Sequence, residues 1–187
     1  MKPLDMFQLY LLSQMRAKDR VRIAAQQLCY GVDALEEAAE TAKGVGLEQP
    51  GHPMSTYAQL LGIPSAEELV ESSDPYQRRR HLYRLPLWPT LVLTVVGNER
   101  GETGGISFIG EPQLATPLRQ LNDLKPWEQT ENQLAELLGA ASLQDEWYPQ
   151  KDYVCTGIGS TVGDFVLRFD FDLLQQVLRQ DEKSKLS

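Results

Sequence analysis

The sequence predicts an α+β protein: a helical N-terminal half with a long amphipathic helix, followed by a small antiparallel sheet of about four strands, in two hairpins, with two helices. Apolar residues recur at steps of three and four over residues 18–43, which is typical of a helix with one buried face. After Pro89 the apolar residues form short β-branched and aromatic runs between glycines, which is typical of strands. We therefore expect a helical region over residues 1–87 and an α+β region over residues 88–187, which can pack as a single domain.

The long helix over residues 18–43 is the most regular element of the sequence. Its apolar face carries Val21, Ala25, Leu28, Val32, Leu35, Ala39 and Ala42. Gly31 lies inside the helix, where glycine weakens it or lets another backbone approach closely, and Gly44 and Gly46 are expected to end it. An apolar face of this kind ordinarily joins the core, but it can also pair two copies of a chain. A homo-oligomer through this helix therefore remains open.

The segment before the long helix has an ambiguous boundary. Pro3 suits the first turn of a helix. The apolar spacing then continues through Leu4, Phe7 and Leu11. Gln14 and Lys18 interrupt this spacing, so residues 3–43 form either one helix of about 40 residues or two helices with a break near residues 16–18. We favour the break.

Residues 44–56 are rich in glycine and proline and are expected to form a loop. Two short helices should follow, over residues 55–61 and residues 65–70, and Ser65 with Glu68 makes a capping box for the second. Two short helices joined by a turn are also the arrangement of a helix-turn-helix DNA-binding motif. The second helix carries glutamates where a base-reading helix would carry Arg, Lys, Asn or Gln, so we interpret the pair as packed helices.

The densest mixture of basic and aromatic residues lies in residues 74–90. The predicted partner-binding surface comprises Arg78, Arg79, Arg80, His81, Tyr83, Arg84 and Trp88. Arginine with tyrosine and tryptophan is enriched at the centres of protein interfaces, and a guanidinium group pairs well with carboxylates. The predicted partner is therefore another protein with an acidic surface. The alternative is a solvent-exposed helix whose basic side chains pair with the glutamates of the long helix.

Two hairpins are predicted in the second half of the chain. Residues 91–96 and residues 106–109 are apolar runs separated by a polar, glycine-rich loop, and residues 152–158 and residues 164–171 are separated by a second such loop. Residues 164–171 alternate apolar with polar residues, which predicts a strand with one buried face and one solvent-exposed face.

Two helices are expected to accompany these hairpins. Residues 126–138 carry Trp127 and several leucines on one side and are followed by Gly139, which can stop a helix. Asp172 is expected to cap a second helix, because it precedes closely spaced apolar residues.

The net charge of −8 opposes binding to a phosphate backbone, so nucleic acid is disfavoured as a partner. Cys29 and Cys155 are not in a metal-binding spacing, and we expect Cys155 to be buried and Cys29 to be at least partly buried. The first residues make a poor signal peptide, and no apolar run approaches the roughly 20 residues that a membrane helix needs. We expect a cytoplasmic protein without membrane insertion.

Motifs of cofactor binding or catalysis are missing from the sequence. It has no Walker loop, HExxH or GxSxG pattern, and its two histidines have no sequence neighbours that would suggest a metal or a catalytic triad. Asp164, Asp170 and Asp172 are expected to share one strand face and could hold a hard cation, but Arg168 between them favours a salt-bridged surface. We expect no cofactor and no metal site.

The preferred interpretation is a non-catalytic accessory protein that binds another protein, such as an assembly factor, an adaptor or a small subunit of a complex. The first alternative is a small α+β enzyme or ligand-binding domain with a site between the sheet and the helices. That site would use some of Arg78, Arg80, His81, Asp164 and Asp170. The second alternative is a nucleic-acid-associated component of a complex, held through the arginine run.

Overall fold

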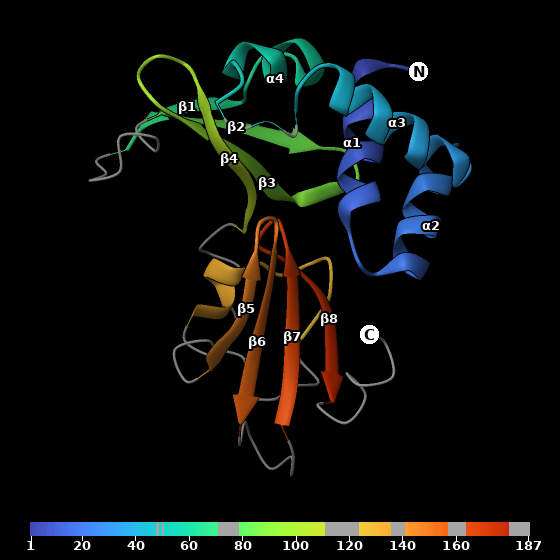
Figure 1. Cartoon of the computed structure of the whole chain (residues 1–187), viewed down its shortest axis with the longest axis vertical. Coiled ribbons are helices and arrows are strands. Elements are labelled where there is room, and N and C mark those ends of the chain that lie inside the picture. The colour runs from blue at the N-terminus through green and yellow to red at the C-terminus, as the bar shows by residue number, and fades with distance from the viewer. Residues whose placement is uncertain are drawn as a thin grey trace. The chain divides into compact units, whose positions relative to one another are not determined.

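The computed structural model describes residues 1–47, 49, 51–70, 79–110, 124–135, 141–156 and 164–179 of the 187-residue chain. The chain packs as two compact units, Met1–Ser107 and Phe108–Ser187. The described strands form two four-stranded sheets, and in both sheets neighbouring strands follow one another along the chain (Figure 1). The change of sequence pattern near residue 88 falls inside the first sheet.

The first unit is built around a buried helix. Its helices are α1 (Pro3–Gln14), α2 (Lys18–Gln27), α3 (Asp33–Gly44) and α4 (Met54–Leu61). Every residue of α1 from Met6 to Leu12 is buried, and the other three helices all contact it (Figure 1). Pro3 is the first residue of α1, as predicted. The predicted break before residue 18 is confirmed, because the backbone becomes extended at Met15.

The prediction of one long amphipathic helix over residues 18–43 is wrong. Cys29 adopts a left-handed backbone conformation with φ 66°. The Tyr30 N–H donates a 3.0 Å hydrogen bond to the Ala25 carbonyl, which is the kind of bond that closes the C-terminal end of a helix. Val32, on the expected apolar face, is 57% exposed. Local helix termination thus outweighs the apolar spacing, and the homo-oligomer prediction loses the continuous helix on which it depends.

The first sheet contains β1 (Ala66–Leu69), β2 (Arg79–Leu85), β3 (Trp88–Gly97) and β4 (Thr103–Gly110), and the last three residues of β4 belong to the second unit. The hairpin predicted over residues 91–96 and 106–109 is confirmed, since β3 and β4 are neighbours in the sheet. The short helix predicted over residues 65–70 is wrong, because β1 pairs there with β2 in antiparallel register. Long charged side chains suit helices, but here Glu68 lies opposite Arg80 and pairs with it across the strands at 3.6 Å.

The sheet of the second unit contains β5 (Ser142–Trp147), β6 (Gln150–Thr156), β7 (Asp164–Asp170) and β8 (Leu173–Arg179). The predicted pairing of residues 152–158 with residues 164–171 is confirmed by β6 and β7, in which Tyr153 lies opposite Leu167. The turn between them, residues 157–163, lies outside the described residues.

The prediction that one face of β7 is exposed to solvent is wrong. Asp164 is exposed at the start of the strand, but Val166 and Asp170 on the same expected face are both buried, each at 0% exposure. Arg168 is also largely buried and pairs with the buried Asp152 at 3.5 Å. The polar side chains of β7 that are buried therefore interact with other protein groups rather than with water.

The helix predicted from Asp172 onward is wrong, because that segment is strand β8. Phe171 and Asp172 have φ values of 54° and 60°, and Asp170 lies opposite Leu173, so these two residues make a tight hairpin turn. A turn with positive φ at both central positions matches the twist of a two-stranded hairpin. The chain therefore reverses at the point where a helix cap was expected.

The helix predicted over residues 126–138 does not begin where it was expected. Trp127 has a positive φ of 71°, which ends any regular helix there. Residues 131–134 form the short 3₁₀ helix η3 (Glu131–Leu134), Ala135 is α-helical, and residues 136–138 lie outside the described residues. The fold is thus an α+β arrangement of short helices and two antiparallel sheets rather than a helical half followed by one sheet.

Replacement of Phe169 tests the core of the second unit. Phe169 is fully buried and packs edge-on against Tyr153, with ring centroids 5.7 Å apart. Phe169→Ala should lower the free energy of unfolding by about 3–5 kcal/mol in urea denaturation, because it removes buried apolar surface and leaves a cavity. Leu143→Ala on the exposed strand β5 is the control and should change it by less than about 0.5 kcal/mol. Equal effects of the two substitutions would contradict this assignment of the core.

Candidate functional site

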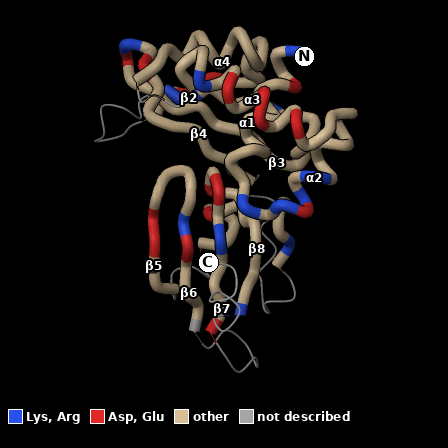
Figure 2. Tube along the Cα trace, turned by 45° about the vertical axis from the view of Figure 1, so that its right-hand side comes forward, with Lys and Arg blue, Asp and Glu red and all other residues tan. Residues whose placement is uncertain are grey.

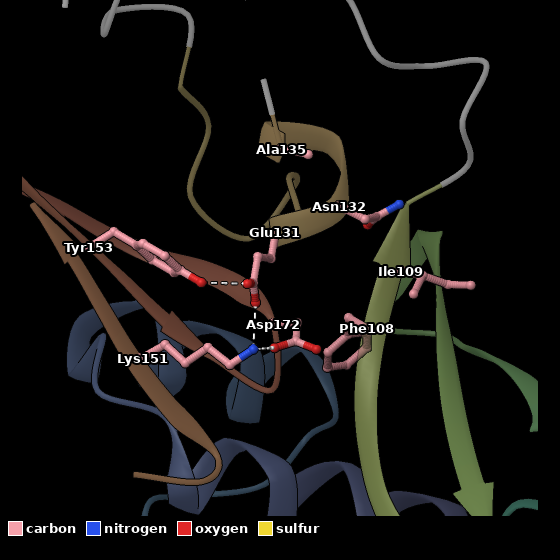
Figure 3. Close-up of a pocket in the computed structure, with 8 residues that line it drawn as sticks. All are labelled: Phe108, Ile109, Glu131, Asn132, Ala135, Lys151, Tyr153 and Asp172. Atoms are coloured by element: carbon pink, nitrogen blue, oxygen red, sulfur yellow. Dashed lines mark hydrogen bonds and ion pairs between the residues drawn. The ribbon is translucent and has the colours of Figure 1, made fainter. Parts of the chain in front are cut away.

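The second unit contains a cavity of about 470 Å³ with a cluster of ionisable side chains in its wall (Figure 3). Its lining residues are Phe108, Ile109, Glu131, Asn132, Ala135, Lys151, Tyr153 and Asp172. They come from the end of β4, from η3 and the residue that follows it, and from strand β6, and one comes from the turn between β7 and β8. All of them belong to the unit Phe108–Ser187.

Glu131 is positioned by the start of η3. Thr130 and Gln133 form a capping box, which fixes the backbone at this end of the short helix. The Thr130 hydroxyl also accepts a 2.9 Å hydrogen bond from the Gly110 N–H. The Glu131 N–H donates a 2.8 Å hydrogen bond to the Asp172 carbonyl. The backbone thus brings Glu131 and Asp172 together before their side chains interact.

Asp172 is positioned by the turn between β7 and β8. Asp is among the few non-glycine residues that adopt positive φ without a large penalty. The neighbouring Phe171 is held on both sides: its N–H donates to the Pro149 carbonyl at 2.8 Å, and its carbonyl accepts from the Phe108 N–H at 2.7 Å. The turn is therefore fixed to β4 and to the β5–β6 hairpin, and the Asp172 side chain faces the cavity (Figure 3).

Lys151 and Tyr153 are two residues apart on β6, so their side chains lie on the same face of the sheet. The Lys151 Nζ lies 2.7 Å from Glu131 Oε2 and 2.9 Å from Asp172 Oδ1. The Tyr153 hydroxyl donates a 2.6 Å hydrogen bond to Glu131 Oε1. Figure 3 shows the ammonium group between the two carboxylates, so one cation bridges two anions.

The environment shifts the pKa of both carboxyl groups, in opposite directions. Burial tends to raise the pKa of Glu131, but hydrogen bonds from Lys151 and Tyr153 outweigh it, so the pKa lies below its usual range. Burial also raises the pKa of Asp172, and with the hydrogen bond and negative charge of Glu131 it exceeds the lowering by Lys151, so this pKa lies above its usual range. Glu131 is thus held as the anion, and Asp172 is the carboxyl that takes up a proton more readily.

Lys151 and Tyr153 stay protonated at neutral pH. Burial lowers the pKa of Lys151, but its hydrogen bonds to Glu131 and Asp172 more than compensate, so the pKa lies above its usual range. Burial, followed by the hydrogen bond to Glu131, raises the pKa of Tyr153 to about 12. An ammonium group of this kind is neither a nucleophile nor a base, because both roles need the neutral amine. The cluster can therefore bind and orient a ligand, with Asp172 as its one group suited to exchange a proton.

The residues predicted to bind a partner protein do not form one surface. Arg78 lies outside the described residues. Tyr83 and Trp88 are buried, each at 2% exposure, and so belong to the core. His81 is partly buried, with its Nε2 3.8 Å from Glu67 Oε1 on β1. Arg79, Arg80 and Arg84 lie along β2, and Arg80 pairs with Glu68 as described above. Partner binding stays a prediction for the exposed Arg79 and Arg84.

Among the described residues that were predicted for a cation site or a ligand site, only Asp172 lines the cavity. Asp164 and Asp170 are at opposite ends of β7, which a strand of this length separates by roughly 20 Å. Within the described ranges, no group of three or more His, Cys, Asp or Glu side chains could hold a metal ion. Of the residues proposed from the sequence for a ligand site, Arg80, His81, Asp164 and Asp170 all lie outside the cavity wall.

The cysteines behave differently from each other. Cys155 is buried, as predicted, and burial raises the pKa of its thiol to about 11. The prediction for Cys29 is wrong, because this thiol is exposed where the chain leaves α2. A buried thiol with a raised pKa is a poor nucleophile, so Cys155 is a core residue rather than a catalytic one.

No family model matches the chain, and comparisons with curated proteins and with solved structures give no match. In the part of the chain that the structure describes, no helix is long and apolar enough to cross a membrane. Function must therefore be inferred from the geometry of the chain itself.

Replacement of Lys151 tests whether its ammonium group stabilises the fold between the two carboxylates. Lys151→Met leaves Glu131 and Asp172 close together without a cation, and it should lower the free energy of unfolding at pH 8 by about 1–3 kcal/mol. Lys125→Met is the matched control, because Lys125 pairs with Glu128 at 3.8 Å on the exposed surface and contributes less than about 1 kcal/mol.

The pH dependence of this effect has a defined sign. Because folding raises the pKa of Lys151, its stabilising contribution is complete at neutral pH and is lost only as the pH rises through the folded-state pKa. Folding lowers the pKa of Glu131, so the stability contributed by this carboxylate is lost as the pH falls through its folded-state pKa. The cost of Lys151→Met in urea unfolding should therefore be smaller at pH 4 than at pH 8. A cost that is the same at both pH values would contradict the cluster.

Proposed function

We propose that the unit Phe108–Ser187 binds a small polar ligand in its cavity and that the chain acts through this binding. The observation that supports the proposal is the charged cluster of Glu131, Lys151 and Asp172 facing a cavity of about 470 Å³. Binding sites for small molecules are typically about 300–1,000 Å³, with an apolar wall and a few converging polar groups. The cavity has both features, since Phe108, Ile109 and Ala135 complete its wall.

The positions of the charged groups also support binding. Their side chains are partly open to solvent, at 24% exposure for Lys151, 25% for Glu131 and 31% for Asp172. This cluster is held by backbone hydrogen bonds and opens into the cavity, so a ligand can reach it without disrupting the fold.

Catalysis is less well supported than binding. Lys151 and Tyr153 are held in their protonated forms, and Glu131 is held as the anion. General acid–base catalysis needs a group that changes protonation near the working pH and a second group that complements it. Only the pKa of Asp172 is shifted toward a working pH near neutrality, so the cluster lacks a second group that could act as the complementary acid or base.

Filling the cavity should abolish binding without unfolding the protein. The cavity is probed by nuclear magnetic resonance with three ligands of similar shape: n-butylammonium, n-butanol and butyrate. At least one should shift the backbone amide signals of Glu131 and Lys151. Ala135→Phe and Ile109→Phe, both at the cavity wall, should weaken that binding by about tenfold or more.

Lys125→Phe adds the same ring at an exposed position outside the cavity and is the control. It should leave both binding and the melting temperature nearly unchanged. The proposed function is wrong if none of the three ligands shifts the signals of the cavity residues, or if the filled variants bind as well as the wild type.

A second candidate function is the binding of another protein, in keeping with an accessory role. The observation that favours it is the edge strand β5, of which every residue is exposed. Trp147 is 80% exposed and Tyr148, in the following turn, is 62% exposed. Exposed aromatic residues beside the outermost described strand of a sheet suit the addition of an extended peptide strand. Asp145 and Glu146 on β5 give this edge a negative charge (Figure 2), so the partner would be an extended segment that carries basic residues.

This second candidate can be tested with the fluorescence of Trp147. A peptide of alternating lysine and valine should shift the tryptophan emission to shorter wavelength, because pairing with β5 would partly bury Trp147. Trp147→Phe should remove the shift. Of the other two tryptophans, Trp88 is buried, and Trp127 is partly buried with its indole N–H bonded to Gln175 at 2.9 Å. A peptide of alternating glutamate and valine is the control. An equal response to both peptides, or no response to either, would contradict a basic partner at this edge.

A further inference from the structure

We infer that the ligand of the cavity is a small organic cation, a primary ammonium group on a short apolar body. This inference rests on the proposed function and adds the chemical class of the ligand. It is drawn from the balance of charges in the cluster, from the acceptor positions left on the two carboxylates and from the apolar part of the cavity wall.

The balance of charges favours a cation. The cavity wall holds two carboxyl groups, Glu131 and Asp172, and one ammonium group, Lys151. With both carboxyl groups ionised the cluster has one negative charge in excess. Lys151 already contacts both carboxylates, at 2.7 and 2.9 Å, so an anionic ligand would have to compete with them for the one ammonium group. A second cation would instead neutralise the excess charge, which is costly to leave in a partly buried site.

The carboxylates still have room for further donors. A carboxylate offers about four lone-pair positions, and an ammonium group carries three donors. Glu131 receives hydrogen bonds from Lys151 and Tyr153, whereas Asp172 contacts Lys151 through Oδ1. The ligand ammonium is therefore expected at Asp172, where a charge-assisted hydrogen bond to the carboxylate would be strong.

The rest of the wall defines the remainder of the ligand. Phe108, Ile109 and Ala135 supply an apolar surface, and the Tyr153 ring lines the same cavity. A short alkyl or aromatic body would displace water from these groups, which is favourable. An aromatic face also attracts a cation that lies over it. A strongly hydrated inorganic cation would not gain from this apolar surface, so the site favours an organic ammonium ion.

Binding of an ammonium ion should be linked to protons. Asp172 has a raised pKa, and its neighbours in the cavity are Glu131, Lys151 and Tyr153, of which the last two stay protonated at neutral pH. The ligand would bind the ionised form of Asp172 more tightly than the neutral form. Affinity should therefore fall as the pH is lowered through the folded-state pKa of Asp172, and binding in that range should release protons.

The test compares the same three probes by calorimetry on the full chain. n-Butylammonium should bind at least about tenfold more tightly than n-butanol, which has nearly the same shape without the charge, and butyrate should bind more weakly than either. If n-butanol or butyrate binds as tightly as n-butylammonium, the inference is wrong while the proposed function still holds. If no probe binds, the proposed function itself fails and the inference fails with it.

Asp172→Asn provides the second arm of the test. Asparagine tolerates positive φ and keeps the shape of the side chain, so the turn should be retained, which the melting temperature checks. The variant should bind n-butylammonium about tenfold more weakly, should bind n-butanol unchanged and should lose the proton release. Glu128→Gln removes an exposed carboxylate outside the cavity and should alter none of these. Unchanged n-butylammonium affinity in a folded Asp172→Asn variant would overturn the inference.

Discussion

The second unit depends on one ammonium group held between two carboxylates. Lys151 comes from β6, Glu131 from the start of η3 and Asp172 from the turn between β7 and β8. Backbone hydrogen bonds bring these segments close, and without the ammonium group the same geometry would hold two carboxylates together in a partly buried place. The positive charge of Lys151 therefore stabilises the close approach of the two carboxylates that the backbone imposes. Two carboxyl groups and one ammonium group then face the cavity.

The same cluster underlies the proposal that the cavity binds a ligand rather than catalysing a reaction. The ion pairs hold Lys151 as an ammonium ion and Glu131 as an anion, so neither is available to transfer a proton. Permanent charges with fixed backbone supports are preorganised for recognition, because little rearrangement is needed when a ligand arrives. The first unit stabilises its polar residues differently: Arg80 and His81 on β2 lie opposite Glu68 and Glu67 on β1 and pair with them across the strands.

The sequence predicted strands whose local composition is typical of strands. It failed where a helix was predicted across a residue that has positive φ. The β-branched runs identified the β3–β4 hairpin and the β6–β7 pair. The three helix predictions that failed around Cys29, Trp127 and Asp172 share one cause, because each of these residues has positive φ without being glycine. Glycine is the residue from which positive φ is expected in a sequence, whereas here other residues adopt it. A local helix-ending hydrogen bond closes the turn at Cys29, and hydrogen bonds to distant segments hold Trp127 and the turn at Asp172. The cavity was not predicted because Glu131, Lys151 and Asp172 lie on separate segments and form no motif. Asp172 was singled out in the sequence, but as a helix cap and a possible cation ligand, and the alternation of Lys151 and Tyr153 on β6 was the one local signal for the other residues.

The most direct test of this account is a measurement of the carboxyl pKa values of Glu131 and Asp172 by carbon-13 nuclear magnetic resonance. The account predicts that Glu131 titrates below its usual range and Asp172 above it, because burial, Lys151 and the second carboxyl act on both. It also predicts that the pKa of both groups rises in the Lys151→Met variant, since the ammonium group favours both anions. Two carboxyl groups that titrate at ordinary values, and that do not respond to the loss of Lys151, would contradict it.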